Sequence, residues 1–252
     1  MPNSSPHSCI WRSVDRPPAI AGDDVHLWRI DLDASDAVYE GCHALLDDGE
    51  RARADRFRAS RQSQRFAVAR GTLRHLLGAY LETEPHQLEF AYAEHGKPFL
   101  QHPKTDLHFN VSHSGNAALM AFARGRDLGV DVERTQREVG WERVARRFFA
   151  GPELAELMAL NPDQRRSGFF RCWTSKEAYM KATGRGITLG LGKFVVRVDP
   201  SLPAELLSVV EGSAHHWWLQ DVDPGPAMAG ALCVSGGAPN IDWLELTVPT
   251  LG

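Results

Sequence analysis

Two short stretches with carboxylates constrain the fold of this chain most: Gly129–Glu133 alternates as strands do, and Trp173–Lys181 has helical spacing. Together they supply Asp131, Glu133 and Glu177. Three carboxylates suit a hard divalent cation such as Mg²⁺, which takes oxygen ligands and often shares its shell with substrate phosphates. If these side chains act together, the fold must bring a strand and a helix that are distant in sequence to one place.

The expected strand has two chemically different faces. Gly129, Asp131 and Glu133 share one face, because side chains alternate along a strand, and the residues between them are apolar. Two carboxylates on one face repel each other unless they are solvated or share a cation. An exposed strand face is the ordinary interpretation, so the pair alone is weak evidence for a site. The glycine ahead of it leaves room for a ligand to approach the backbone.

The expected helix brings Phe170, Trp173, Glu177 and Lys181 onto one face, at spacings of three and four residues. The two aromatic residues anchor this face in a core and carry the two charged residues to its edge, where a cleft can begin. An exposed Glu–Lys pair of no functional consequence is the alternative. The acidic strand upstream favours the functional interpretation.

Composition limits the classes of protein to consider. Hydrophobic residues make up 43% of the 252 residues and charged residues 24%, as in soluble globular proteins, and the formal net charge of −4 gives no reason to expect a nucleic-acid partner. The four cysteines form no CxxC pair, so we expect neither disulfides nor zinc, and a cytoplasmic location. Residues 1–22 are rich in Ser and Pro and are expected to form a loose arm, not a secretory signal. No apolar run reaches transmembrane length, so no membrane association is expected.

Helical and strand periodicities alternate in two successive blocks, which predicts an α+β fold. The expected helices are 34–46, 50–81 with a break near Ser60, 139–149, 153–160 and 163–183. The expected strands are 24–33, 88–93, 107–111, 117–123, 128–133, 193–199, 215–222, 227–235 and 241–248. Segment 117–133 is expected to form a hairpin around a turn at Gly125.

A basic segment covers much of the second expected helix. Its guanidinium groups suit phosphate, although most of them are expected to be solvated. A nucleic-acid-binding face is the rival, disfavoured by the acidic total and the lack of interleaved aromatic residues. The residues are Arg51, Arg53, Arg56, Arg58, Arg61, Arg65, Arg70 and Arg74.

Two further segments offer groups for a phosphate. Ser112–Gly115 follows a strand, and a turn there presents hydroxyls, the His113 imidazole and backbone N–H groups. A structural hydrogen bond is an equal alternative for His113, and a serine hydrolase is disfavoured because no GxSxG elbow exists. Lys97 lies between Gly96 and Pro98 as a cation on a stiff turn, and its alternative is a plain turn lysine.

In this order the segments resemble the Sfp-type 4′-phosphopantetheinyl transferases, over about residues 45–200. Each motif is short, and the combination is specific. The matching segments are Arg65–Arg70, Gly96–Pro98, Phe109–Gly115, Gly129–Glu133, Arg147–Phe149, Trp173–Lys181 and Gly184–Gly186.

The resemblance implies a pseudo-dimer of two similar α+β halves, expected at 1–125 and 126–252, with coenzyme A in the cleft between them. It implies Mg²⁺, or Mn²⁺ in its place, held by Asp131, Glu133, Glu177 and the coenzyme A diphosphate. It also implies phosphate contacts from Lys97, Ser112 and His113, and contacts nearer the adenosine from Arg53 and Arg65. Glu50 is a departure, since some relatives have a basic residue there.

The implied reaction moves phosphopantetheine from coenzyme A to a serine of an acyl or peptidyl carrier protein and releases 3′,5′-ADP. Glu177 is the candidate base, and whether it is base or metal ligand stays open. Lys181 is expected to stabilise the developing charge and Lys176 to assist. We expect a monomer whose partners are the carrier and coenzyme A, and the pathway of the carrier is open. The alternatives are a metal-dependent phosphohydrolase and a non-catalytic module that binds coenzyme A or RNA.

Overall fold

The computed structural model describes residues 9–209 and 211–246. Its helices are α1 (Asp36–Ala44), α2 (Asp48–Asp55), α3 (Ser60–Leu81), α4 (Trp141–Phe148), α5 (Gly151–Ala159) and α6 (Pro162–Thr183), with short 3₁₀ turns at Pro85–Gln87, Gly186–Leu189, Leu191–Lys193 and Ala214–His216. Its strands are β1 (Arg12–Val14), β2 (Asp24–Asp31), β3 (Glu89–Tyr92), β4 (Pro98–His102), β5 (Leu107–Ser114), β6 (Ala117–Arg124), β7 (Leu128–Arg134), β8 (Val195–Val196), β9 (Leu206–Ser208), β10 (Trp217–Val222), β11 (Met228–Ser235) and β12 (Asn240–Leu246).

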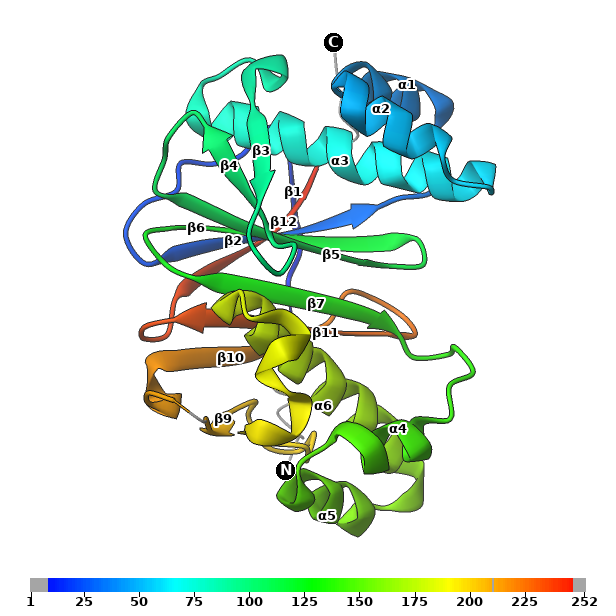
Figure 1. The fold of residues 1–252 in the computed structure, drawn as a ribbon, viewed down its shortest axis with the longest axis vertical. Helices are drawn as coiled ribbons and strands as arrows, with labels where there is room; N and C mark the ends of the chain where they lie inside the picture. Colours follow the sequence, from blue (N-terminus) through cyan, green and yellow to red (C-terminus); the bar gives the residue numbers. More distant parts are fainter. Residues whose placement is uncertain (1–8, 210, 247–252) are drawn as a thin grey trace.

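Two sheets and two long helices form four layers (Figure 1). A five-stranded sheet has the order β1-β12-β2-β6-β5 and is covered on one face by α3. A three-stranded sheet has the order β10-β11-β7 and is covered by α6. The facing surfaces of the sheets share a third core of Val, Leu and Ala side chains from β2, β6, β7 and β11. Both faces of each sheet are therefore buried, which explains the nearly unbroken apolar sequence of β6.

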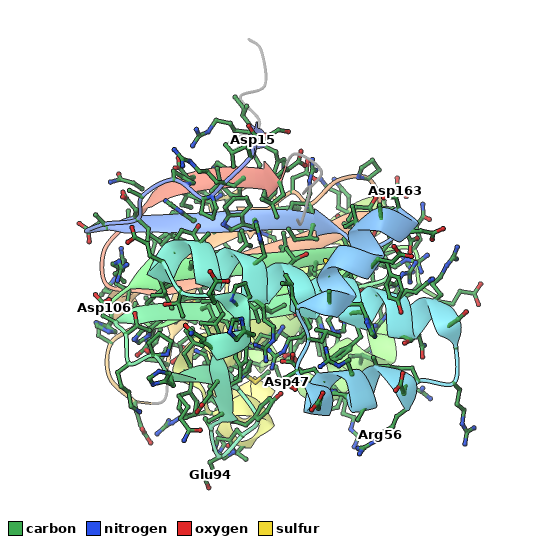
Figure 2. All side chains as sticks on the ribbon, turned by 90° about the horizontal axis from the view of Figure 1, so that it is seen from above. Asp15, Asp47, Arg56, Glu94, Asp106 and Asp163 are labelled. Carbon is green, nitrogen blue, oxygen red and sulfur yellow. The ribbon has the colours of Figure 1, made fainter. Side chains whose placement is uncertain are left out.

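Helices α2 and α3, with the loop between them, carry the basic segment. Asp47 caps α2 by accepting from the Glu50 N–H, while the Glu50 side chain accepts from the Asp47 N–H, a reciprocal capping box. The view from above shows α2 running beside α3, with its cap residues Asp47 and Arg56 at the two ends (Figure 2). The predicted break near Ser60 is confirmed as the boundary between these two helices.

The edge strands β5 and β7 meet where the two sheets join. Side chains of β5 take the place of a main-chain ladder between them. Asn110 Oδ1, Ser112 Oγ and Ser114 Oγ accept from the backbone N–H groups of Val130, Val132 and Arg134, at 2.9, 3.3 and 3.2 Å. The N–H groups that an edge strand leaves unpaired are satisfied in this way, and polar side chains line the junction.

The predicted α+β fold of two halves is confirmed, since each half is a sheet covered by a 22-residue helix. The predicted hairpin over 117–133 is wrong: β6 pairs with β2 and β5, whereas β7 crosses to β11 in the other sheet. Strand β12 returns from the end of the chain to lie between β1 and β2. The division at 125/126 therefore stays a prediction, and β12 does not follow it.

Two local expectations are also corrected. Ser112, His113 and Ser114 lie within β5, and the turn begins only at Gly115. The expected loose arm contains β1, which pairs with β12 and places the Trp11 ring 5.4 Å from that of Trp243, while residues 1–8 lie outside the described part. Among the described residues, no helix has the length and apolar character to cross a bilayer.

Candidate active site

Strand β7 presents its carboxylates to the junction and not to open solvent. Asp131 is only 5% exposed and Glu133 is partly buried, so the ordinary interpretation of an exposed face does not hold. Gly129 is needed for a different reason from the one expected. A Cβ there would lie 2.2 Å from the Ala178 carbonyl oxygen and 2.3 Å from the Ala182 nitrogen. The glycine admits helix α6, and not a ligand, against the strand.

This close packing brings Glu177 and Lys181 of α6 to the carboxylates of β7. Burial, together with the negative charges of Asp131 and Glu133, raises the pKa of Glu177 to about 6 against the opposing effect of Lys181. The predicted convergence of strand and helix is therefore present as an electrostatic cluster. A carboxyl with this pKa is well suited to exchange a proton near neutral pH.

Asp131 is the centre of a hydrogen-bond network. Its Oδ1 accepts from Ser112 Oγ at 2.8 Å and from Lys181 Nζ at 2.7 Å, and Lys181 also donates to Ser112 Oγ at 2.8 Å and to the Val130 carbonyl at 3.1 Å. Asp131 Oδ2 is buried and has no hydrogen-bond partner in the described part of the chain. An orphaned carboxylate oxygen beside other acids is where a hard cation fits by donor chemistry.

Glu133, like Asp131, accepts from a serine of β5 and from a cationic side chain. Its Oε2 accepts from Ser114 Oγ at 2.9 Å and from Arg137 at 3.2 Å. Across residues 9–209 and 211–246, no three Asp, Glu, His or Cys side chains already converge as a metal site requires. The donors therefore fit a cation by type and by the orphaned oxygen of Asp131, while Asp131 and Glu133 are each paired with a cationic side chain of the protein.

Lys97 crosses from the first half to the second. Its Nζ donates to the carbonyls of Leu128 at 3.0 Å and Ala182 at 3.4 Å, and burial lowers its pKa. It lines a pocket of about 240 Å³ together with Lys181 and the glycines that follow α6. The pocket therefore has cationic walls from both halves, and Lys181 connects it to Asp131.

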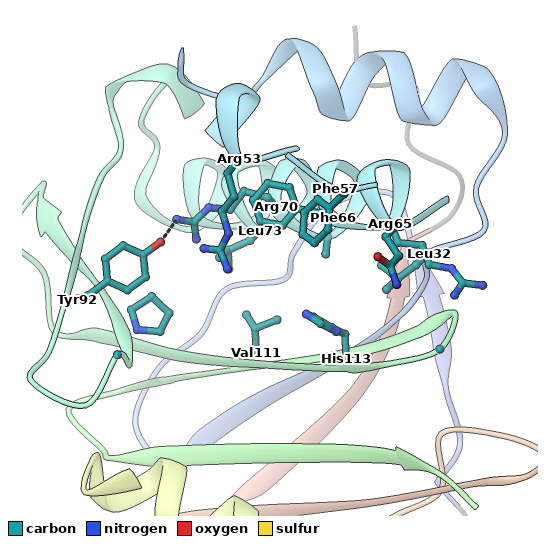
Figure 3. A pocket seen from close by; sticks show the side chains of 15 residues that line it. Leu32, Arg53, Phe57, Arg65, Phe66, Arg70, Leu73, Tyr92, Val111 and His113 are labelled. Carbon is teal, nitrogen blue, oxygen red and sulfur yellow. Dashed lines mark hydrogen bonds between the residues drawn. The ribbon is translucent and has the colours of Figure 1, made fainter. Parts of the chain in front are cut away.

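A larger pocket of about 800 Å³ lies between the basic helices and β5. Figure 3 shows Arg53 and Arg65 above the pocket and Val111 and His113 of β5 below it. Gly96, Pro98 and Val111 line both pockets, so the two are neighbours. Burial and the nearby charge of Lys181 lower the pKa of His113, which favours its neutral form.

The arginines at this pocket differ in their partners. Arg65 forms a two-point ion pair with Asp33 at 2.7 and 2.9 Å, and Arg53 lies over the Phe66 ring at 5.1 Å. Arg70 stacks on the Phe90 ring at 3.9 Å and pairs with Glu50. Sequence reasoning placed Arg53 and Arg65 here but could not show which guanidinium is already neutralised.

Glu50, the departure from the family pattern, has a structural explanation. Its carboxylate is buried and accepts from Arg70 and from the fully buried Arg74, whose guanidinium also reaches Asp47 and the Pro85 and Leu88 carbonyls. A buried guanidinium requires such partners, because an uncompensated buried charge is costly. Glu50 therefore engages two arginines of the basic segment inside the protein, Arg70 and Arg74.

Lys176 lies apart from this cluster. Its side chain is 0% exposed, and its ammonium donates to Glu153 and to the Phe194 carbonyl while lying 4.0 Å from the centroid of the Phe194 ring. Glu153 in turn accepts from the Ala150 and Val196 N–H groups. The pair connects α5, α6 and β8, and none of the contacts of Lys176 with the described residues supports the catalytic role predicted for it.

Sequence reasoning missed two residues of the site, Arg137 and Tyr92. It included Ser114 only as a hydroxyl of an expected turn, whereas Ser114 lies on β5 and donates to Glu133. Arg137 follows Glu133 by four residues, across a bend that periodicity does not reveal. Tyr92 lines the larger pocket and accepts from Arg70 at 3.4 Å (Figure 3).

Two protein-family models match consecutive parts of the chain. The model described as 4′-phosphopantetheinyl transferase, N-terminal, matches residues 32–124, and the model described as 4′-phosphopantetheinyl transferase superfamily matches residues 127–233. The two matches adjoin at the junction of the two sheets.

Curated relatives agree with these matches. The chain is 39% identical to the 4′-phosphopantetheinyl transferase HetI of Nostoc sp. over 227 residues, which cover 88% of this chain and 93% of the relative. It is 28% identical to Sfp of Bacillus subtilis over 186 residues, 74% of this chain and 81% of the relative. It is 36% identical to AcpT of Escherichia coli over 118 residues, 47% of this chain and 57% of the relative. This chain belongs to the 4′-phosphopantetheinyl transferase family and is of the Sfp type.

Proposed function

We propose that this enzyme transfers the 4′-phosphopantetheine group of coenzyme A to a serine hydroxyl of an acyl or peptidyl carrier protein and releases 3′,5′-ADP. The observation that carries the proposal is the cluster of Asp131, Ser112 and Lys181 beside Glu177, in a chain of this family. It adjoins two cationic pockets, of which the larger, about 800 Å³, lies within the range of about 300–1,000 Å³ that small-ligand sites typically occupy.

Charge and pocket size support a position for coenzyme A. We assign its adenosine end to the larger pocket, where Arg53 is the cation without a carboxylate partner in the described chain and Arg65 shares its charge with Asp33. The diphosphate then lies toward Lys97, Ser112, His113 and Lys181. Support comes from the lysines on both sides of the smaller pocket.

Mg²⁺, or Mn²⁺ in its place, is the cation we propose for the carboxylates. Asp131 would hold it through the orphaned Oδ2, with Glu133 and Glu177 as further oxygen donors. Such a cation offsets charge on the diphosphate and on the leaving group. The three acids then divide between two roles, cation ligand and proton acceptor.

The proton of the serine hydroxyl goes to Glu177 as the serine oxygen bonds to the phosphorus that carries the pantetheine arm. The bond from that phosphorus to the 3′,5′-ADP oxygen breaks, and Lys181 stabilises the charge that the leaving oxygen gains. A positioned base of this kind contributes roughly 10²–10⁴-fold. Glu177 cannot be a tight ligand and a free base at once, and comparing the pH dependence of cation binding with that of transfer separates the two roles.

The decisive experiment is intact-mass analysis of apo carrier proteins incubated with the enzyme, coenzyme A and Mg²⁺. The proposal requires each modified carrier to gain the mass of one phosphopantetheine group, with an equal amount of 3′,5′-ADP. Release of phosphopantetheine without a carrier supports the phosphohydrolase instead. Coenzyme A binding without either product supports the non-catalytic module.

We further propose that the enzyme acts as a monomer in the cytoplasm. Support for a monomer is that one chain supplies both walls of the smaller pocket. Support for the cytoplasm is that the buried Cys42, Cys172 and Cys233 are free thiols, as a reducing compartment allows.

A further inference from the structure

The ammonium of Lys181 is fully engaged inside the protein. Its Nζ donates to Asp131 Oδ1 at 2.7 Å, to Ser112 Oγ at 2.8 Å and to the Val130 carbonyl at 3.1 Å. An ammonium has three N–H donors and no acceptor. These three acceptors therefore use every donor, and in this arrangement Lys181 has none left for a phosphate oxygen.

The carboxylate of Asp131 is occupied on one side only. Its Oδ1 accepts from both Lys181 and Ser112, while Oδ2 is buried without a partner among the described residues. A metal cation bound by this carboxylate must share it with the Lys181 charge. Like charges at such close range repel more strongly where water is excluded than in bulk solvent. Lys181 in this position therefore opposes the cation that Asp131 is expected to hold.

The other acid of β7, Glu133, also pairs with a cationic side chain, but more weakly. Glu133 pairs with Arg137 at 3.2 Å, and the Arg137 side chain is half exposed. Exposed ion pairs are screened by solvent and contribute little. Lys181, at 28% exposure against a carboxylate at 7%, is consequently the dominant competitor for a cation at this cluster.

We propose that Lys181 is a resident counter-cation of Asp131, which it releases only when a diphosphate offers its ammonium other acceptors. This inference rests on the proposed function, because it assigns the diphosphate to coenzyme A. The consequence is coupling: a divalent cation binds weakly alone and more tightly once coenzyme A is present. Because the coupling is reciprocal, the cation increases coenzyme A affinity by the same factor.

The test measures Mn²⁺ binding to the metal-free full-length protein by the electron paramagnetic resonance signal of free Mn²⁺, without coenzyme A. Lys181→Gln and Lys181→Met both remove the charge and differ in shape. Both are expected to bind Mn²⁺ about tenfold or more tightly than the parent protein, since an adjacent opposite charge changes the proton affinity of a carboxylate by roughly 1–3 log units. The exposed Lys104→Gln is the matched control for net charge and leaves the affinity unchanged.

Coenzyme A affinity is then measured with and without Mn²⁺. The parent protein is expected to show a larger gain from Mn²⁺ than either Lys181 variant. Mn²⁺ affinities that are equal to or weaker than that of the parent protein in both folded variants, as judged by circular dichroism, overturn the inference. This outcome can be distinguished from failure of the proposed function. If the parent protein modifies carriers but the variants bind Mn²⁺ no better, the function stands and only the role of Lys181 as counter-cation is lost.

Discussion

Ser112 Oγ lies 2.8 Å from Asp131 Oδ1, and this hydrogen bond joins the edge strands of the two sheets at the centre of the candidate site. The same hydroxyl accepts from the Val132 N–H and from Lys181. Ser112 therefore links β5, β7 and α6 through hydrogen bonds. The arrangement explains why residues from both halves are needed: the site is built where side chains of β5 accept from the edge of β7.

Ser112→Ala removes a donor from Asp131 and an acceptor from the Val132 N–H, both of which are buried. We expect the free energy of unfolding to fall by about 1–3 kcal/mol, the usual cost of leaving buried polar groups unsatisfied. Urea unfolding measures this. Ser167→Ala is the comparison, because that exposed hydroxyl bonds only to the Gln164 carbonyl of its own helix among the described contacts. Equal losses of unfolding free energy for the two substitutions would contradict the role of Ser112 as a link between these elements.

Gly129→Ala places a methyl group against the backbone of α6 and is expected to reduce stability by about 1–3 kcal/mol or more, as overpacking does. Transfer activity should fall more than stability explains, because α6 carries Glu177 and Lys181 toward Asp131. Thermal unfolding and carrier modification at a temperature where the variant stays folded measure the two effects. Gly151→Ala, which meets nothing within 4 Å, should leave both properties near those of the parent protein.

Glu177→Gln should stabilise the metal-free protein at neutral pH while it removes activity. The pKa of this carboxyl is raised from 4.5 to about 6 in the folded state, so between these values the folded protein binds more protons than the unfolded one. Its contribution to stability therefore decreases as pH rises through this window, and the full penalty is present above pH 6.

Urea unfolding with a chelator present tests this sign. At pH 7.5 the Glu177→Gln variant should be more stable by on the order of 1–2 kcal/mol, and near pH 4 the two proteins should unfold alike. An exposed acid without a described ion pair, Asp55→Asn, serves as the control for lost charge. If the unfolding free energy of Glu177→Gln exceeds that of the parent protein by the same amount at both pH values, the raised pKa is ruled out as the cause.

Lys176→Met leaves the buried Glu153 carboxylate without its cation and should cost about 3–5 kcal/mol of unfolding free energy. The double variant Lys176→Met/Glu153→Gln removes both charges and should recover part of the loss. If Lys176 serves packing and not chemistry, transfer per folded molecule of the double variant stays within about tenfold of the parent value. Full folding together with a loss as large as that of Glu177→Gln would restore the catalytic assignment.

Periodicity and short motifs predicted the α+β class, both long helices, and the meeting of strand and helix that carry the acids. They failed where the partner of a segment is remote. The hairpin over 117–133 follows from the turn at Gly125, and nothing local shows that β7 pairs with β11, a strand about one hundred residues away. The same limit applies to Lys176 and Lys181. They lie on one helix five residues apart, and only the tertiary structure shows that the first is sealed against Glu153 while the second faces Asp131.

We infer that Asp131 of β7 and Glu177 of α6 act together at one site on coenzyme A. Rates of carrier modification for Asp131→Asn, Glu177→Gln and the double variant test this inference, with folding verified for each. We expect each single substitution to reduce the rate by at least about 100-fold and the double variant to lose little more than the worse single one, because residues that act as a unit are not additive. Two results would contradict this: a double variant whose loss of rate equals the product of the two single losses, or a single variant whose rate stays near that of the parent protein.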